Sequence, residues 1–335
     1  MAMTVENGDY RQAMVANWSR FWASGVGHSC VGSFGAAYGG AIRDWWLARL
    51  SSLTADRVLL DIGTGGGPLP RMLIDRHRAA PFAMPRVIAA DIAEVRFPWL
   101  ADVPTALAAR VTLLSGVAAE RLPLDDASVD LVSSQFGIEY ALHRPAADEV
   151  LRVLRPEGEA AFVLHAADSV LASVAQVECG NLEWLLAGWV NAMQSMIPLM
   201  AKASSEQGRH ALKLDRAAEQ ARGEFNQAMQ ALVERASSSP VPDILLDARN
   251  AASEVLALAG RSGEGVAHAA WEQWVMACRD ALGRQSGLIA AAMDDETLAA
   301  FLAPFEAAGR AANIEVLRHS DGSVLGWAVR IASTI

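Results

Sequence analysis

The stretch Val58-Leu-Leu-Asp-Ile-Gly-Thr-Gly-Gly-Gly-Pro-Leu-Pro70 joins an apolar run to a glycine-rich turn and then to a helical pattern. Glycine adopts positive φ without strain and lets the backbone approach a ligand closely. The dinucleotide fingerprint G-x-G-x-x-G fails here, because Pro68 stands where its third glycine should be. A P-loop is excluded as well, because no Gly-Lys-Ser/Thr follows. The stretch therefore predicts a strand, a ligand-binding turn of another kind and a helix.

The spacing of this turn is Asp-x-Gly-x-Gly-x-Gly, formed by Asp61, Gly63, Gly65 and Gly67. An acidic residue that opens the turn would repel a pyrophosphate, because like charges repel at short range. The same carboxylate would suit a cationic amino group. We therefore expect a ligand that carries a positive charge near this turn.

Short apolar runs alternate with helical patterns on both sides of the turn. The predicted strands are residues 58–63, 86–92, 110–116, 129–136 and 159–165. This alternation is typical of a parallel sheet covered by helices on both faces. The final run, residues 314–333, is interrupted by Ser320-Asp321-Gly322, which favours a hairpin. We predict an α/β fold with a doubly wound sheet that ends in an antiparallel hairpin.

In this order the motifs resemble those of the class I S-adenosylmethionine-dependent methyltransferases. The resemblance covers about residues 51–168 and the final hairpin. The segment SGVAAERLPLDDASVDLVSSQFGIEY, residues 115–140, resembles the third and fourth motifs of the family. The segment LRVLRPEGEAAFVLH, residues 151–165, resembles the helix, turn and fifth strand that follow. The resemblance implies a Rossmann-like sheet, S-adenosyl-L-methionine as cofactor and methyl transfer as the activity.

The resemblance also implies roles for individual residues. Asp61 and the glycines match the first motif, which packs around the methionyl and ribose parts of the cofactor. Asp91 matches the acidic residue that accepts hydrogen bonds from the ribose hydroxyls, and Ile92 would lie against the adenine. Ala119 stands where the family commonly has an aspartate that contacts the adenine amino group, which leaves that contact to backbone groups or to Glu120. The predicted cofactor-binding residues are Asp61, Gly63, Thr64, Gly65, Gly67, Asp91, Ile92, Ala118, Ala119, Glu120, Ser134 and Gln135.

Candidate catalytic side chains follow the fourth and fifth predicted strands, since ligands of open α/β sheets bind outside the carboxyl ends of strands. Glu139, Tyr140 and His143 follow the fourth strand, and His165 ends the fifth. We expect these side chains near the transferred methyl group, where a base can remove a proton from the substrate. Glu139 and His143 are equally compatible with solvated or helix-capping roles.

Aromatic residues gather near the N-terminus. Residues 10–22 and 41–53 have helical patterns, and the glycine-rich loop between them contains His28 and Cys30. Methyltransferases of the family often cover the site with N-terminal helices, which implies a cap over the cofactor. The candidate cap residues are Tyr10, Trp18, Trp22 and Tyr38.

We divide the chain into an N-terminal helical cap (1–50), a cofactor-binding domain (51–168 and 312–335) and an all-helical insertion (169–311). Helices are predicted at 209–236, 246–258, 266–282 and 295–308. The apolar stretch 185–200 reads as a buried or substrate-facing helix. We expect the insertion to serve as a substrate lid with an apolar pocket, or as an interface that supports a homodimer.

Composition narrows the class of protein. The chain has 335 residues, 52% of them hydrophobic, and a formal net charge of −10, which excludes a disordered chain and disfavours a nucleic-acid partner. The stretch 185–200 contains Asn191 and Pro198, so it is a poor membrane span. The three cysteines are far apart and form no metal-ligand spacing, and the N-terminus lacks a signal peptide. We therefore expect a cytoplasmic protein with no metal site.

Three functional hypotheses remain open. The first is methyl transfer to a small lipophilic molecule, with an oxygen acceptor, hydroxyl or carboxylate, favoured. The second is carbon methylation of a quinone-like ring, because LPLDDASVD and VLRPEG also resemble that group. The third is a cofactor-binding regulator without catalytic activity.

Overall fold

The computed structural model describes residues 2–30, 38–79 and 84–334. It separates into two compact units, one formed by Met1–Ala172 with Gly287–Ile335 and the other by Ser173–Ser286. The chain passes from one unit to the other within α7 (Val170–Trp184) and returns within α12 (Glu264–Ala291). The helical unit is therefore shorter at both ends than the expected insertion of 169–311, and the N-terminal segment belongs to the unit that contains the sheet.

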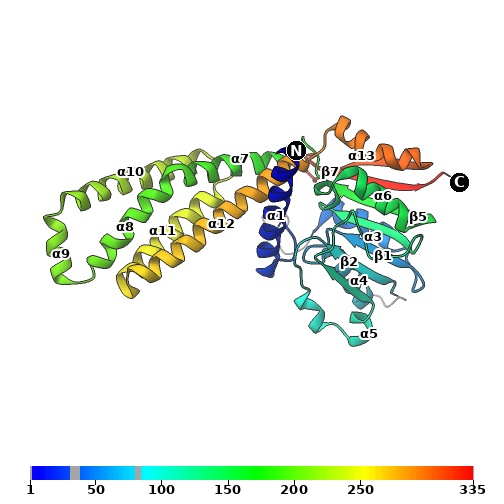
Figure 1. Ribbon diagram of the computed structural model, residues 1–335, viewed down its shortest axis with the longest axis horizontal. Helices are drawn as coiled ribbons and strands as arrows, with labels where there is room; N and C mark the ends of the chain where they lie inside the picture. The colour runs from blue at the N-terminus through cyan, green and yellow to red at the C-terminus, as the bar shows by residue number, and fades with distance from the viewer. Residues whose placement is uncertain (1, 31–37, 80–83, 335) are drawn as a thin grey trace. The chain divides into compact units, whose positions relative to one another are not determined.

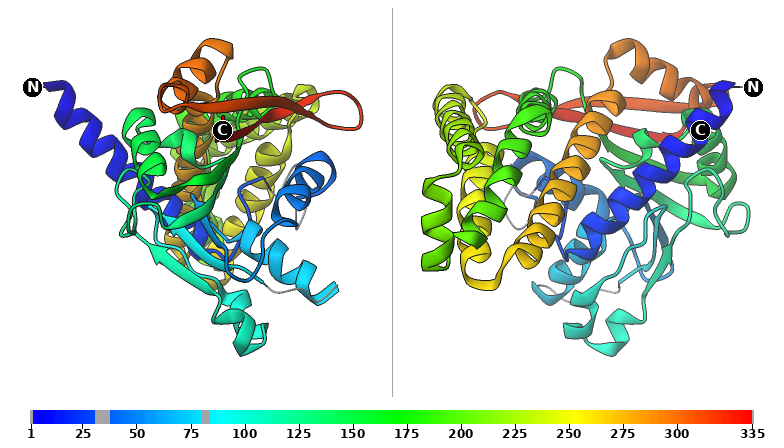
Figure 2. Two further views of the ribbon diagram at one scale, coloured as in Figure 1. Left: turned by 90° about the vertical axis from the view of Figure 1, so that its right-hand side faces the viewer. Right: turned by 60° about the vertical axis from the view of Figure 1, so that its left-hand side comes forward.

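Seven strands form one sheet in the order β3-β2-β1-β4-β5-β7-β6. Strands β3, β2, β1, β4 and β5 run parallel to one another, whereas β7 runs antiparallel to both β5 and β6. The doubly wound sheet with an antiparallel end hairpin is thus confirmed, and the hairpin is drawn in red tones in Figure 2. The strands are β1 (Val58–Ile62), β2 (Arg86–Asp91), β3 (Val111–Ser115), β4 (Val129–Gln135), β5 (Leu154–Leu164), β6 (Arg310–Arg318) and β7 (Val324–Ser333).

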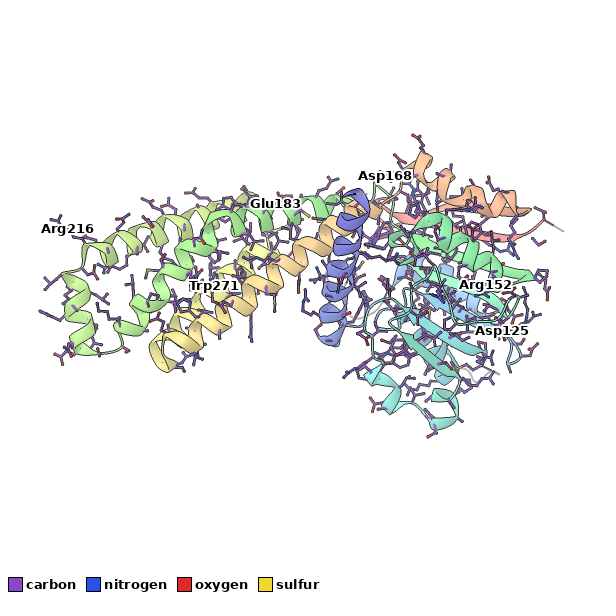
Figure 3. All side chains as sticks on the ribbon, in the orientation of Figure 1. Asp125, Arg152, Asp168, Glu183, Arg216 and Trp271 are labelled. Carbon is purple, nitrogen blue, oxygen red and sulfur yellow. The ribbon has the colours of Figure 1, made fainter. Side chains whose placement is uncertain are left out.

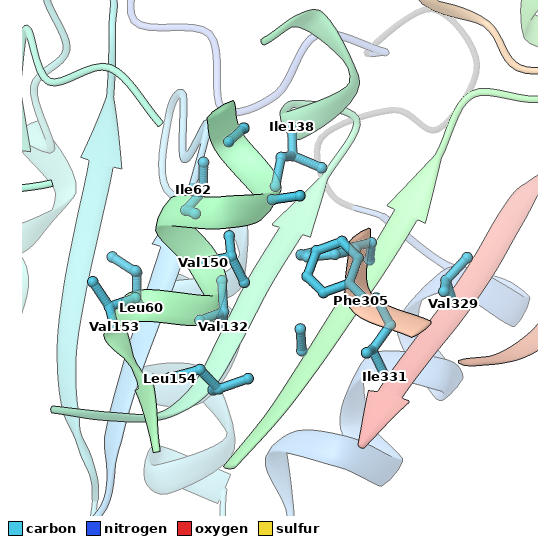
Figure 4. Close-up of a cluster of buried hydrophobic side chains, with 14 of the residues drawn as sticks. Leu60, Ile62, Val132, Ile138, Val150, Val153, Leu154, Phe305, Val329 and Ile331 are labelled. Atoms are coloured by element: carbon cyan, nitrogen blue, oxygen red, sulfur yellow. The ribbon is translucent and has the colours of Figure 1, made fainter. Parts of the chain in front are cut away.

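Both faces of the central strands β1 and β4 are buried, and successive side chains of a strand point to opposite faces. Leu60 and Phe162 pack on one face against α6 (His143–Val153) and α13 (Asp295–Ala307), in the core shown in Figure 4. Neighbouring strand residues pack on the other face against α3 (Gly40–Leu50) and α4 (Pro68–Ala79). Burial of each large apolar side chain contributes about 1.5–3 kcal/mol. This core fixes the carboxyl ends of the strands.

Helix α13 belongs to the sheet unit, although its sequence was assigned to the insertion. Leu298, Phe301 and Phe305 are buried in the sheet core, and the Phe301 ring lies 5.9 Å from that of Phe162. The alanine-rich pattern of 295–308 matches that of the preceding helices. This pattern does not indicate which hydrophobic core the helix joins. The C-terminal boundary of the helical unit could therefore not be predicted from the sequence.

The segment between β3 and β4 is held by Arg152, which is labelled in Figure 3. Its guanidinium donates to the carbonyls of Leu122 and Leu124 and forms ion pairs with Glu149 and Asp126. One α6 side chain therefore fixes the loop that follows the third strand.

The helical unit consists of the C-terminal part of α7, a π-helical turn (Leu185–Trp189), α8 (Val190–Lys202), α9 (Glu206–Lys213), α10 (Arg216–Ser238), α11 (Asp243–Ser262) and most of α12 (Figure 1). Trp189 and Trp271 are buried in its core, with ring centroids 5.8 Å apart. The predicted helix at 209–236 is two helices, because Asp215 caps α10 by accepting the backbone N–H groups of Ala217 and Ala218. No helix within the described residues is long and apolar enough to cross a bilayer.

The remaining elements belong to the sheet unit. Helix α1 (Ala2–Ala23) is longer than the predicted 10–22, and α3 ends at Leu50. Two short helices, η1 (Pro98–Asp102) and α5 (Thr105–Ala108), follow β2, and a third, η2 (Ile138–Tyr140), follows β4.

Candidate functional site

The glycine-rich turn after β1 requires glycine at two positions for different reasons. Gly63 has φ of +65°, and a Cβ there would lie 2.9 Å from the Cα of Gly137. Gly65 has φ of +53°, and a Cβ there would lie 2.5 Å from the Trp22 ring. The turn therefore touches the loop after β4 on one side and helix α1 on the other.

Two buried carboxylates hold the turn in place. Asp61 accepts hydrogen bonds from the hydroxyls of Thr64 (2.7 Å) and Ser133 (2.8 Å). Asp91 accepts the backbone N–H groups of Gly65 and Ala93, each at 2.8 Å. Burial raises the pKa of Asp61 to about 7 and that of Asp91 to about 6. Each Asp91 oxygen retains capacity for a further hydrogen bond from a ligand.

A cavity of about 820 Å³, partly open to solvent, lies at this edge of the sheet. In the sheet, β2 and β3 lie on one side of β1, whereas β4 lies on the other side. The ends of these strands therefore divide the wall of the cavity into two sides. The β1, β2 and β3 side is formed by Ile62, Gly63, Thr64, Gly65, Pro68, Asp91, Ile92, Val117, Ala119 and Glu120.

Helix α1 forms another part of the wall with a single face. Arg11, Met14, Trp18 and Trp22 follow at intervals of three or four residues and all line the cavity. The Trp18 and Trp22 rings stack with centroids 5.7 Å apart. Arg11 forms an ion pair with Glu120 at 2.7 Å, and Glu120 also accepts the Leu142 N–H. The contact with adenine, expected from Glu120 or from backbone groups near Ala119, stays a prediction.

The β4 side of the cavity is aromatic. Phe136 has φ of +54°, a rarely populated conformation for a bulky residue, and strained residues cluster at functional sites. Its ring lies 6.2 Å from that of Tyr38 and 4.2 Å from that of His165. The wall on this side is formed by Trp18, His28, Ser29, Tyr38, Gln135, Phe136, Gly137, Tyr140 and Ala141.

Of the four predicted catalytic residues, Tyr140 lines the cavity, and Glu139, His143 and His165 do not. His165 is buried against Phe136, and burial lowers its pKa to about 3. Glu139 Oε1 accepts the backbone N–H of His165 at 3.0 Å, and burial raises the pKa of Glu139 to about 7. The His143 ring contacts Phe301 and the Glu139 carbonyl. Tyr140 and Glu139 are neighbours in sequence but differ in placement, because the turn of η2 directs Tyr140 to the cavity and Glu139 into the core.

Four predicted cofactor residues also lie outside the wall. Asp61 is occupied in holding the turn, and a Cβ on Gly67 would meet the rings of Phe97 and Trp99. The Ser134 hydroxyl donates to the Ile62 carbonyl and accepts the Ile138 N–H, which ties β4 to β1. Ala118 lies beside the wall residues Val117 and Ala119. The other eight line the cavity, namely Gly63, Thr64, Gly65, Asp91, Ile92, Ala119, Glu120 and Gln135.

The cap residues Trp18, Trp22 and Tyr38 line the cavity, whereas the side chain of Tyr10 lies outside the described residues. The helical pattern of 10–22 places Met14 on one face with Trp18, but sequence reasoning gave Met14 no role in the site and missed Arg11, which lies on the same face. Every described residue that lines the cavity belongs to the sheet unit, so none comes from residues 173–286. The expected apolar pocket built by the insertion is thus not this cavity.

Comparison with known proteins agrees with this geometry. Residues 60–162 match the family described as a methyltransferase domain. Uncharacterized methyltransferases of Mycobacterium tuberculosis and Mycobacterium bovis are each 33% identical to the chain over 155 residues. The match covers 43% of this chain and 57% of each relative, so the chain spans just over half the length of these curated relatives.

Two solved structures are also similar. A putative S-adenosyl-L-methionine-dependent methyltransferase of Methanococcus maripaludis is 21% identical, with a TM-score of 0.30 over 37% of this chain and 54% of that chain. The geranyl diphosphate C-methyltransferase of Streptomyces coelicolor is 17% identical, with a TM-score of 0.31 over 38% of this chain and 45% of that chain.

The sheet order, the turn after β1, the position of Asp91 and the family match define the class. The chain contains a class I S-adenosylmethionine-dependent methyltransferase domain, with S-adenosyl-L-methionine as its cofactor. The residues present fit this group. Asp91 lines the cavity and offers acceptors for ribose hydroxyls, and Ile92 with Val117 offers an apolar surface for adenine.

Proposed function

We propose that the protein is an S-adenosylmethionine-dependent methyltransferase that acts on a small lipophilic molecule through an oxygen acceptor. One observation carries this proposal. A single cavity joins the cofactor residues Gly65 and Asp91 to an aromatic wall that includes Phe136 and Tyr140. An apolar substrate bound to that wall would lie beside the cofactor, which is the arrangement that methyl transfer requires.

When bound, the cofactor would supply an activated methyl group on a sulfonium, which an acceptor oxygen of the substrate would take over. Asp91 would orient the ribose, and the turn at Gly63 and Gly65 would hold the methionyl part. Trp18 and Trp22 on α1 would exclude water from the reacting atoms. A hydroxyl acceptor would lose its proton to solvent at the open side of the cavity.

Charge favours a hydroxyl over a carboxylate as the acceptor. Arg11 is the only arginine or lysine among the described residues that line the cavity, and it is already paired with Glu120. A carboxylate on the substrate would have no cation of its own, and a buried unpaired charge is costly. A neutral hydroxyl carries no such cost.

Carbon methylation of a quinone-like ring is the second candidate, because the aromatic wall would also accept a flat ring. A cofactor-binding regulator without turnover is the third. The test is methyl transfer from S-adenosyl-L-methionine with a radiolabelled methyl group to paired lipophilic alcohols, phenols, carboxylic acids and quinols. The proposal expects methyl ethers. Methyl esters would show that the acceptor is a carboxylate rather than a hydroxyl. Ring-methylated quinols would favour the second candidate, and binding of the cofactor without any product would favour the third.

For the helical unit we propose a role as substrate lid or homodimer interface. The support is a set of exposed large apolar side chains, of which Val233 and Leu246 border a shallow groove between α10 and α11. Light scattering after size exclusion tests the dimer, which Leu246→Asp should dissociate. A monomeric wild-type protein would contradict it. A small-molecule partner rather than a nucleic acid, and a cytoplasmic location, remain predictions.

A further inference from the structure

The side chain of Gln135 is a polar group without a clear structural task. It ends β4, lines the cavity and is 8% exposed. The Tyr38 hydroxyl is its polar neighbour, yet neither the Oε1 nor the Nε2 of Gln135 makes a hydrogen bond of good geometry within the described chain. A buried amide left without a partner is destabilising, because it has lost its hydrogen bonds to water. Such a cost suggests that the partner of this amide is a ligand.

The position of Gln135 points to the substrate rather than to the cofactor. The residue lies at the end of β4, whereas Asp91 and Ile92 lie at the end of β2, with β1 between the two strands. Its sequence neighbour Phe136 and the nearby Tyr38 belong to the aromatic side of the cavity. An amide there would meet the acceptor group of a molecule bound against those rings.

The rings around Gln135 suit a flat molecule. Phe136 stacks on His165 with an interplanar angle of 12°, so its orientation is fixed by a buried neighbour. Tyr140 stands nearly perpendicular to both Trp18 and His165. Aromatic rings prefer such offset and edge-to-face contacts with other aromatic rings. A planar ring held between these walls would gain more than an aliphatic chain of similar size.

We propose that Gln135 is the specificity-determining residue of this site and that its amide selects a planar aromatic acceptor with a hydroxyl group, a phenol. The inference rests on the proposed function and deepens it. A hydroxyl both donates and accepts, so it can satisfy the Oε1 or the Nε2 of the amide. A carboxylate can only accept and would bring an unpaired charge into the cavity, and a hydrocarbon would leave the amide unsatisfied.

Calorimetry on the full chain saturated with S-adenosyl-L-homocysteine tests this inference with 2-naphthol, 2-naphthoate and naphthalene as probes. Wild-type protein should bind 2-naphthol at least about tenfold more tightly than either other probe, because sites that hydrogen-bond a hydroxyl reject analogues without one. Gln135→Leu should bring 2-naphthol and naphthalene to within about threefold of each other. Gln135→Glu retains an acceptor and should restore part of the preference for 2-naphthol.

Two further readouts separate specificity from a structural role. Gln135→Leu should not lower the melting temperature, since it removes a buried amide without a well-made hydrogen bond. It should also keep the affinity for S-adenosyl-L-homocysteine within about threefold of wild type. The matched control is Gln194→Leu on an exposed position of α8, which should leave probe binding unchanged.

The outcomes are distinguishable. If S-adenosyl-L-homocysteine does not bind wild-type protein, the proposed function fails and this inference falls with it. If it binds but 2-naphthol does not, or binds no better than naphthalene, the inference alone is overturned. A Gln135→Leu variant that loses S-adenosyl-L-homocysteine while it keeps the preference for 2-naphthol would make Gln135 a cofactor residue and would also overturn it.

Discussion

Nη2 of Arg11 lies 2.7 Å from each carboxylate oxygen of Glu120. The pair joins helix α1 to the loop after β3, two segments 109 residues apart in sequence. Burial raises the pKa of Glu120, but the Leu142 N–H and Arg11 outweigh it, so the pKa is lowered overall. The carboxylate is therefore ionised at neutral pH and holds α1 against the cavity.

Arg11→Met should weaken S-adenosyl-L-homocysteine binding about three- to tenfold, because α1 carries Trp18 and Trp22 into the cavity wall. The melting temperature should change little, since partly exposed ion pairs contribute only about 0–1 kcal/mol. Calorimetry and thermal melts measure the two effects. Arg144→Met, which removes an exposed pair with Asp148 on α6, is the matched control and should alter neither. Unchanged affinity in Arg11→Met would show that the pair does not position α1.

Gly63→Ala should destabilise the protein by about 2–4 kcal/mol. The left-handed conformation costs an alanine about 1–2 kcal/mol, and its Cβ would also meet the backbone of Gly137. Urea denaturation measures the loss. Gly223→Ala lies inside α10 with open space around it and should instead stabilise by about 0.5–1 kcal/mol. Equal effects at the two positions would contradict the role given to the turn.

The buried carboxyl of Glu139 should make stability fall as pH rises. Its folded pKa of about 7 lies above the ordinary 4.5, so the folded state retains a proton that the unfolded state releases between these values. The glutamine side chain in Glu139→Gln stays neutral at every pH, and its amide oxygen can still accept the backbone N–H of His165. Relative to wild type, the variant should gain up to roughly 3 kcal/mol between pH 4.5 and 8, at about 1.4 kcal/mol per pKa unit.

Urea denaturation at several pH values measures this difference. His165, whose pKa is lowered by burial, has the opposite effect between pH 6.5 and about 3, but it is present in both proteins and largely cancels. Glu149→Gln provides a control of opposite sign, because Arg152 lowers the pKa of Glu149 and that stabilisation is lost as pH falls. A pH-independent difference between wild type and Glu139→Gln would contradict a buried, protonatable Glu139.

The sheet could be predicted from sequence because its signals are local. The run 58–62 is apolar except for Asp61 and is followed by glycines with positive φ, and Asp321-Gly322 marks the final hairpin. The end of the helical unit could not be predicted, since α13 resembles its neighbours and only the buried Phe301 and Phe305 reveal its partner. The local sequence pattern predicts whether a segment forms a helix or a strand. It predicts less well which hydrophobic core that segment joins.

The candidate site was predictable in part for the same reason. Gly63, Gly65 and Asp91 lie at strand ends, where topology alone brings them together. The direction of a side chain within η2 depends on a single turn. The sequence therefore could not predict which of Tyr140 and Glu139 faces the cavity. The Arg11–Glu120 pair joins segments distant in sequence and leaves no local pattern at all.

The central claim is that the cavity beside Asp91 holds S-adenosyl-L-methionine. The direct test is calorimetric titration of wild type and Asp91→Asn at pH 8, well above the Asp91 pKa of about 6, with thermal melts to verify folding. The account predicts one cofactor per chain and a loss of at least about tenfold in the variant, since hydrogen bonds to a charged acceptor contribute about 1.5–3 kcal/mol each. No binding by wild type, or equal binding by folded Asp91→Asn, would contradict it.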